Sequence, residues 1–170
     1  MRAQTKALVL VGAAALLVAC GQPAETPAAT GAGPATATAP SADDAARAEL
    51  QKTALAALPA PYNTADLDNG QRKFALCRSC HTIVEGGANM TGPNLHGLMG
   101  RTAGTAAKFN FSDAVKGAGF TWDADHLDKW LADPRGFLPG NRMTFVGVKD
   151  PEDRRDLIAY LMVETAKSDD

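Results

Sequence analysis

The chain has 170 residues, of which 45% are hydrophobic and 21% charged, and its formal net charge at pH 7 is −2. All aromatic residues follow Pro61, and residues 21–40 are almost entirely alanine, threonine, proline and glycine, a composition that cannot bury enough apolar surface to fold. The globular part is therefore residues 62–170, and a segment of this length is too short for two ordinary domains, a large α/β enzyme or a repeat array. It also lacks the stripe of basic residues that binding to nucleic acid requires.

The N-terminus is typical of an export signal. Two basic residues precede the apolar run Ala7–Ala19, which is shorter than the roughly 20 residues that a helix needs to cross a membrane. The segment Leu17–Cys20 resembles the lipobox of bacterial lipoproteins, in which the cysteine is lipidated and becomes the first mature residue. We therefore expect a lipoprotein-type signal peptide over residues 1–19 and a lipid on Cys20. The alternative is an ordinary secretory signal with an incidental cysteine.

Residues 20–61 are expected to tether the folded domain. The part before Ser41 is rich in proline, alanine and glycine, which is typical of a flexible to semi-extended linker. From Ser41 onward the chain is alanine-rich, with a serine that can cap a helix and two early aspartates that suit a helix N-terminus. We predict a spacer helix within residues 41–58, ended by Pro59, and one domain over residues 62–170.

Inside the domain the hydrophobic periodicity is helical wherever it is clear. It predicts helices over residues 64–80 and 123–133, and a last helix that is capped by Asp150. Long loops rich in glycine and proline are expected over residues 85–100 and 135–148. No alternating run of strand length is present, so the predicted class is all-α with long loops.

Cys77, Cys80 and His81 form the pattern CxxCH, which is typical of covalent haem attachment. Two thiols separated by two residues can add to neighbouring vinyl groups of a haem, and the next histidine is then held under the iron. A redox-active CxxC is disfavoured because no βαβ pattern surrounds it, and a Cys77–Cys80 disulfide would close a very short loop. A structural zinc site would need four ligands, with only His96 and His126 as further strong ones. We predict one covalently attached haem c.

The sixth position on the iron has several candidates on sequence grounds. Met162 lies on the apolar face of the last helix, where core packing is expected, and His126 lies among aspartates, which suggests a solvated face. Met143 follows the turn-forming residues Pro139–Arg142, which can bring a thioether to a metal. Spacing favours Met143 only modestly over the others, which also include His96, Met90 and Met99.

Several motifs in a fixed order provide a family resemblance. From about Asn69 to Ala166 the chain resembles a class I cytochrome c of the mitochondrial and bacterial c2-like type. The matching motifs are CRSCH (77–81), TGPNLHGLMGR (91–101), FTWDADHLDKWLADP (120–134), FLPGNRMTFVGV (137–148) and DLIAYL (156–161). The resemblance implies a small all-α cytochrome c fold, in which three main helices, short helices and loops wrap around a covalently bound haem.

The resemblance also implies a role for each matching residue. Cys77 and Cys80 would form thioethers to the haem, and His81 and Met143 would be the axial iron ligands. The carbonyl of Pro93 would accept a hydrogen bond from the Nδ1–H of His81, which fixes the imidazole tautomer. Further implied contacts are Arg101 and Trp122 near a haem propionate, His96 in a loop that packs on the haem, and Gly70 and Phe74 against Tyr160 where the first and last helices cross.

Three residues depart from the family pattern around the haem. Phe111 stands where relatives often carry a tyrosine, Val115 where an asparagine is common, and Trp130 where a tyrosine is common. All three reduce or relocate polar contacts, so the ligation is expected to be intact while the reduction potential and the stability of the methionine–iron bond are left open.

The expected function is electron transfer and not enzyme catalysis. An iron with histidine and methionine ligands has no open position, which suits one-electron transfer through the haem edge. We expect a monomeric, membrane-tethered carrier on the periplasmic side of a bacterial membrane, or a soluble periplasmic one without the lipid. It would connect a quinol-oxidising complex with a terminal oxidase or reductase. Relatives dock through lysines around the haem edge, for which this chain offers a smaller set: Arg78, Arg135, Arg142 and Lys149.

Two alternatives remain open at this point. In the first, Met143 leaves the iron and the protein acts as a haem peroxidase or a ligand sensor. In the second, it is an accessory electron donor to one particular periplasmic enzyme.

Overall fold

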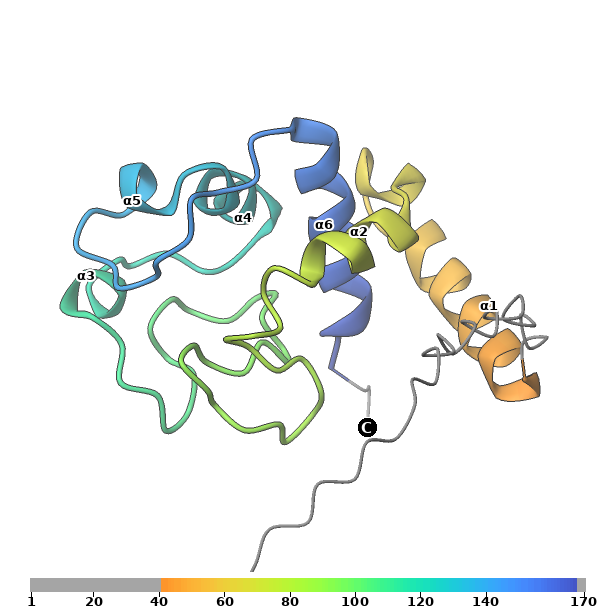
Figure 1. The fold of residues 1–170 in the computed structure, drawn as a ribbon, viewed down its shortest axis with the longest axis horizontal. Helices are drawn as coiled ribbons and strands as arrows, with labels where there is room; N and C mark the ends of the chain where they lie inside the picture. The colour runs from red at the N-terminus through yellow and green to blue at the C-terminus, as the bar shows by residue number, and fades with distance from the viewer. Residues whose placement is uncertain (1–40, 168–170) are drawn as a thin grey trace, which may run out of the picture. The chain divides into compact units, whose positions relative to one another are not determined.

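Helices and the loops between them account for residues 41–167, the part of the chain that the computed structural model describes. In chain order (Figure 1) the elements are α1 (Ala42–Ala56), the short 3-10 helix η1 (Tyr62–Thr64), α2 (Leu67–Phe74), α3 (Asp113–Lys116), α4 (Ala124–Ala132), α5 (Pro134–Phe137) and α6 (Pro151–Glu164). Within these residues no β-strand forms, and Thr102 and Thr121 make an isolated antiparallel bridge. The predicted all-α class is confirmed.

The predictions on the N-terminal segment lie outside the described residues. They are the signal peptide over residues 1–19, the lipid on Cys20 and the tether up to residue 40. Within residues 41–167, no helix combines the length and the apolar character needed to cross a membrane.

The crossing of α2 and α6 is the most extensive helix contact of the described chain (Figure 1). Gly70 is buried there, and a Cβ atom at this position would lie 2.6 Å from the Cβ of Tyr160. The rings of Phe74 and Tyr160 pack with their centroids 5.6 Å apart, a usual distance for an aromatic pair. The predicted crossing of these three residues is confirmed, and the missing side chain at Gly70 allows the helices to touch.

Local sequence signals begin α6 as predicted. Asp150 accepts hydrogen bonds from the backbone N–H groups of Glu152 and Asp153, both at 2.9 Å, and Pro151 fits the first turn because its missing N–H is not needed there. Residues 157–161 are all buried, and Met162 packs against the core as expected. The helix therefore forms the central support of the domain.

The other two predicted helices of the domain are present with different bounds. α4 closely follows the prediction, since the Asp123 carboxylate caps it by accepting from the N–H of His126 at 2.8 Å. Pro134 ends α4 and opens α5 within a segment that was expected to be a loop. α2 ends at Phe74, whereas its periodicity predicts a helix up to residue 80.

The predicted spacer helix is present as α1. Ser41 and Asp44 form a capping box, in which each side chain accepts a hydrogen bond from the other residue's backbone N–H. In Figure 1, α1 lies on the other side of α6 from α3, α4 and α5. Its contact with α6 is polar: the Glu164 carboxylate accepts from Arg47 at 2.8 Å and from Gln51 at 2.6 Å. No residue of α1 is buried, so these contacts hold it against the domain.

Candidate functional site

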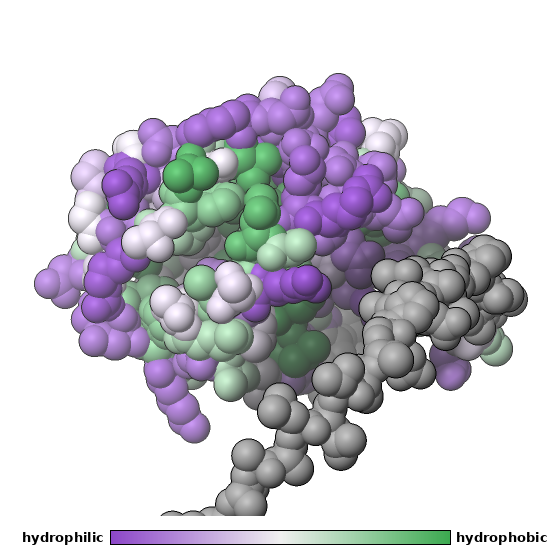
Figure 2. All heavy atoms as spheres, in the orientation of Figure 1, coloured by the Kyte–Doolittle hydropathy of each residue, from purple (hydrophilic) through white to green (hydrophobic). Residues whose placement is uncertain are grey.

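One cavity collects most of the residues singled out by the sequence. Its volume is about 480 Å³, within the range of roughly 300–1,000 Å³ for sites that hold small molecules and cofactors. Figure 2 shows hydrophobic residues gathered around a hollow on this face, with hydrophilic residues along its upper edge. The cavity is lined by Cys80 and His81, by residues between Thr91 and Val115, by Trp122 and Trp130, and by residues 141–144.

The CxxCH segment reaches the cavity through tight turns and not through a continued helix. The N–H of Cys77 donates to the carbonyl of Phe74 at 2.8 Å, and the N–H of Cys80 donates to the carbonyl of Cys77 at 3.0 Å. These bonds span three residues and tighten the chain beyond the end of α2. Both thiols are free and half-buried, and burial raises the pKa of Cys77 to about 11. Cys77 is therefore a neutral thiol at neutral pH.

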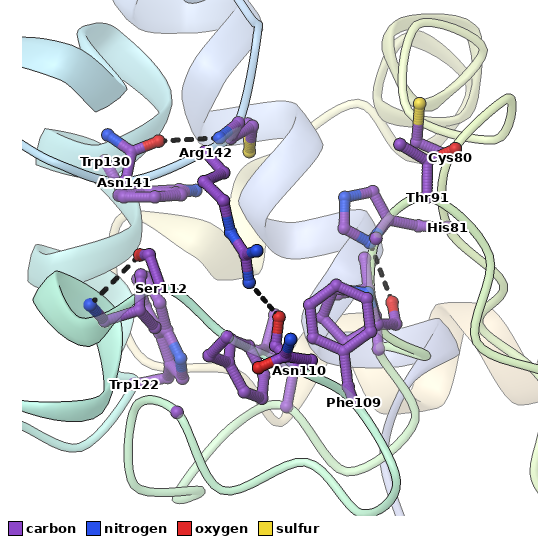
Figure 3. A pocket seen from close by; sticks show the side chains of 18 of the residues that line it. Cys80, His81, Thr91, Phe109, Asn110, Ser112, Trp122, Trp130, Asn141 and Arg142 are labelled. Atoms are coloured by element: carbon purple, nitrogen blue, oxygen red, sulfur yellow. Dashed lines mark hydrogen bonds between the residues drawn. The ribbon is translucent and has the colours of Figure 1, made fainter.

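His81 is oriented for a ligand on its Nε2 atom. Its Nδ1 lies 2.7 Å from the carbonyl oxygen of Pro93, which can only accept, so the proton sits on Nδ1 and the Nε2 lone pair is free (Figure 3). Burial lowers the pKa of His81, although the bond to Pro93 acts in the opposite direction. The imidazole is therefore neutral at neutral pH, as a metal ligand must be.

Gly92 provides the space for this imidazole. A Cβ atom at Gly92 would lie 2.6 Å from Nε2 and 2.7 Å from Nδ1 of His81. Sequence reasoning did not single out Gly92, because its requirement comes from a contact between two segments. Its place in the TGPN motif, directly before Pro93, is the signal that could have identified it.

Arg101 and Trp122 are brought together by paired backbone bonds. The N–H of Trp122 donates to the carbonyl of Arg101 at 2.9 Å, and the N–H of Gly100 donates to the carbonyl of Trp122 at 2.9 Å. The guanidinium of Arg101 donates to the carbonyls of His96 and Asn94 at 3.1 and 3.2 Å. Burial lowers the pKa of Arg101, which nevertheless remains a cation at neutral pH. A half-buried cation beside a buried indole suits an acidic group of a bound cofactor.

Met143 is the one methionine in the cavity wall within the described residues. Met99 and Met162 pack against the hydrophobic core, and Met90 is exposed. Figure 3 shows Cys80 and His81 on one side of the cavity, and Asn141 and Arg142, the residues directly before Met143, on the other. His96 and His126 do not line the cavity. A free imidazole nitrogen and a thioether therefore belong to the same apolar pocket.

The model of the family described as cytochrome c matches residues 67–163, more than half of the chain. The chain belongs to the cytochrome c family. Members of this family carry a covalently bound haem c and act as electron carriers and not as enzymes. The predicted family, cofactor and fold are thereby confirmed.

Individual relatives agree with this assignment. Cytochrome c of Chlamydomonas reinhardtii is 48% identical over 102 residues, which is 59% of this chain and 91% of the relative. Cytochrome c2 iso-2 of Magnetospirillum fulvum is 52% identical over 88 residues, 52% of this chain and 91% of the relative. Among solved structures, cytochrome cH from Methylobacterium extorquens matches with a TM-score of 0.54 and 44% identity, covering 57% of this chain and 97% of that one.

The pocket of this cytochrome c fits a haem in volume and in chemistry. Cys80, the imidazole of His81 with its free Nε2, the thioether of Met143 and the cation of Arg101 all line the cavity. The other predicted thioether residue, Cys77, is half-buried against the hydrophobic core and does not line the cavity. The three residues that depart from the family pattern, Phe111, Val115 and Trp130, all line the cavity. They make its wall more apolar, which agrees with the expected loss of polar contacts.

Other predicted residues lie elsewhere or behave differently. His126 was expected on a solvated face, but its ring is half-buried and stacks on Phe120 with centroids 4.4 Å apart and planes 8° apart. The sequence pattern misled because the flanking aspartates are exposed while the ring turns toward an aromatic cluster. The four cations proposed for docking are all exposed, but Arg142 donates to the carbonyl of Asn110, and Lys149 donates to the carbonyl of Ala132 at 2.7 Å.

Proposed function

We propose that this cytochrome c is a membrane-tethered one-electron carrier of a respiratory chain, with His81 and Met143 as iron ligands and Cys77 and Cys80 as thioether residues. The main support is that the imidazole of His81, with its Nε2 free, and the thioether of Met143 line the same apolar cavity. The bound haem supplies a redox centre. When the haem is bound, Cys77 and Cys80 would attach it covalently, and His81 and Met143 would bind its iron.

The proposed ligation explains why electron transfer is the function that fits best. With two protein ligands the iron has no open position for oxygen or peroxide. A thioether ligand in an apolar pocket favours the ferrous state and raises the reduction potential. The lining by Phe111, Val115 and Trp130 acts in the same direction, since these side chains offer little polarity to stabilise the ferric charge.

The proposed location follows from the N-terminal sequence. A lipid on Cys20 would hold the protein on the periplasmic side of a bacterial membrane, at a high local concentration near partners embedded in that membrane. A quinol-oxidising complex would supply the electrons, and a terminal oxidase or reductase would receive them. Contacts with such partners would be transient, and Arg78, Arg135, Arg142 and Lys149 would guide them.

The ligation is tested by replacing Met143. The ferric protein should show the long-wavelength absorption band of a methionine–iron bond, and Met143→Ala should lose it. Met90→Ala is the matched control, since Met90 is exposed and outside the cavity wall, and it should keep the band. Rapid binding of carbon monoxide to the unmodified ferrous protein would contradict the proposal and favour a peroxidase or sensor.

The membrane anchor is tested by replacing Cys20. Expressed with its own signal in a bacterium that processes lipoproteins, the unmodified protein should sediment with membranes. Cys20→Ser should appear in the soluble periplasmic fraction, because no acyl chain can then be attached. A Cys20→Ser protein that stayed in the membrane with its signal uncleaved would show that the lipoprotein interpretation is wrong.

A further inference from the structure

The loop that carries Met143 has little internal support. We define the Met143 loop as residues 138–150, between α5 and α6. Among the described residues, the backbone groups of residues 142–147 make no hydrogen bond to other backbone groups. A thioether at the centre of such a segment needs another source of order to stay at one position.

The far end of the loop is fixed against α4. The N–H of Val148 donates to the carbonyl of Leu131 at 2.8 Å. Gly147, with a φ of +92°, packs so closely on the end of α4 that a Cβ would lie 2.8 Å from the carbonyl carbon of Ala132. This attachment lies on the C-terminal side of Met143. On the N-terminal side, the exposed side chain of Arg142 donates to the carbonyl of Asn110.

Asn141 supplies a second attachment on the N-terminal side, and its side chain is half-buried. Its Nδ2 donates to the carbonyls of Pro134 at 2.7 Å and Leu138 at 2.8 Å, while its Oδ1 accepts from the backbone N–H of Met143 at 2.8 Å (Figure 3). Pro134 is among the most deeply buried residues of the domain, so this side chain joins Met143 to a rigid part of α5. The hydrogen bond to Oδ1 of Asn141 is made by the backbone N–H of Met143 itself, the residue proposed to bind the iron.

We propose that Asn141 is a positioning residue for Met143, and that its three hydrogen bonds set how readily the thioether leaves the iron. The inference rests on the proposed ligation by Met143. Without the Asn141 side chain, the loop would be held before Gly147 only by the exposed side chain of Arg142, and residues 143–146 could move away from the cavity together. With it, the backbone of Met143 can move away only if its bond to Oδ1 of Asn141 breaks, or if the two bonds that hold Asn141 to Pro134 and Leu138 break.

The experiment uses imidazole, which competes with the thioether for ferric iron. At saturating imidazole the binding rate of the haem-loaded protein should reach a plateau, which measures the release of Met143. Asn141→Ala should raise this plateau and the apparent imidazole affinity by at least about tenfold, from the loss of three hydrogen bonds. Asn141→Asp keeps an acceptor for the N–H of Met143 but loses both donors. Its plateau rate should therefore lie between those of the unmodified protein and Asn141→Ala.

Asn69→Ala is the matched control. Asn69 is also half-buried, and its Nδ2 donates to Asp153 at 3.0 Å and to Asp156 at 2.9 Å, so its removal weakens the crossing of α2 and α6, away from the Met143 loop. This variant should lose thermal stability while keeping the imidazole plateau of the unmodified protein.

The possible outcomes distinguish a failure of the inference about Asn141 from a failure of the proposed ligation by Met143. An Asn141→Ala protein with the methionine band and an unchanged plateau would show that Asn141 does not position Met143. An equal rise in Asn69→Ala would show that global stability, and not the loop, controls release, and would also overturn the inference. An unmodified protein with no methionine band and no plateau would instead contradict ligation by Met143.

Discussion

Two buried glycines place strict steric demands on single positions in this domain. Gly92 leaves room for the imidazole of His81, and Gly70 leaves room for the backbone of Asp156 and the side chain of Tyr160. In both cases a Cβ atom would meet a group that cannot move cheaply, because that group belongs to a ring or to helix backbone. Even alanine is therefore too large at these two positions.

Gly70→Ala tests how much stability depends on the absence of a side chain at this position. We expect it to lower the free energy of unfolding of the haem-loaded protein by about 2–3 kcal/mol, since overpacking at a helix crossing forces the helices apart. Chemical denaturation followed by far-UV circular dichroism would measure the loss. Gly117→Ala is the control: its φ of −89° suits alanine, and its Cβ would lie 3.2 Å from the carbonyl of Asp113. Equal losses in the two variants would contradict the steric explanation.

At the scale of residues, the sequence predicts those functional groups that form a characteristic motif with fixed spacing. Cys77, Cys80 and His81 are identified because the CxxCH pattern has few other uses in an all-α chain. Gly92 and Asn141 could not be identified in that way. An asparagine in a turn is common, and only the folded chain shows that the side chain of Asn141 reaches from Pro134 to Met143.

At the scale of elements, α2 and α6 are joined by a buried carboxylate as well as by apolar contact. Asp156 is 4% exposed. Its oxygens accept from Asn69 at 2.9 Å, from the backbone N–H of Asp66 at 3.1 Å and from Arg155 at 2.7 Å. Burial alone would raise the pKa of Asp156, but these hydrogen bonds outweigh it and hold the pKa below the ordinary value of 3.8.

This carboxylate makes the crossing sensitive to acid. A lowered folded pKa means that ionised Asp156 stabilises the fold above pH 3.8, and that this stabilisation is lost as the pH falls through the folded pKa. Asp156→Asn should therefore cost about 1.5–3 kcal/mol of unfolding free energy at pH 7, and the difference from the unmodified protein should shrink below about pH 3.8.

Denaturant unfolding of the haem-loaded proteins at pH 7 and near pH 3 would measure that difference. Asp68→Asn is the control, because Asp68 is an exposed carboxylate on α2, the helix that crosses α6. A stability difference for Asp156→Asn that stayed constant over this pH range would contradict the expectation.

The elements were predictable to the extent that their ends carry local signals. α4 and α6 begin where Asp123 and Asp150 cap them, and α1 begins where Ser41 does. α2 is shorter than its periodicity indicates, because the spacing of Cys77 suits a helix as well as the tight turns that replace it. α5 was not predicted because proline after α4 reads as a stop, although it equally suits a first turn.

At the scale of the whole molecule, the distribution of charge matters more than its total. The formal net charge is only −2, so no strong overall field favours one partner. Arg142 nevertheless places a cation in the wall of the haem cavity, while Lys52 lies on α1 with a side chain 77% exposed. A charge change at Arg142 should therefore affect the approach of a charged redox reagent to the haem, whereas a charge change at Lys52 should not.

Arg142→Glu tests this difference with small redox reagents in place of a protein partner. Reversing one charge about 10 Å from a trivalent reagent in water is worth about 2.5 kcal/mol before screening by salt, which corresponds to a change in rate of up to roughly 70-fold at very low salt. Electron transfer with the anionic reagent ferricyanide should slow by up to this factor, and transfer with a cationic hexaammine complex should quicken. Lys52→Glu should leave both rates nearly unchanged, and high salt should remove the effect in Arg142→Glu. Equal responses of the two variants would contradict a local role for Arg142.

The contact of α1 with Glu164 determines where the first described residues lie on the domain. A helix of this length extends about 22 Å, and while Arg47 and Gln51 keep it against α6 it moves with the domain as one body. The N-terminal end of the described chain, at Ser41, thus lies with α1 on the opposite side of α6 from α3, α4 and α5. A redox partner that approaches the haem cavity from the side of α3, α4 and α5 would therefore meet no part of α1.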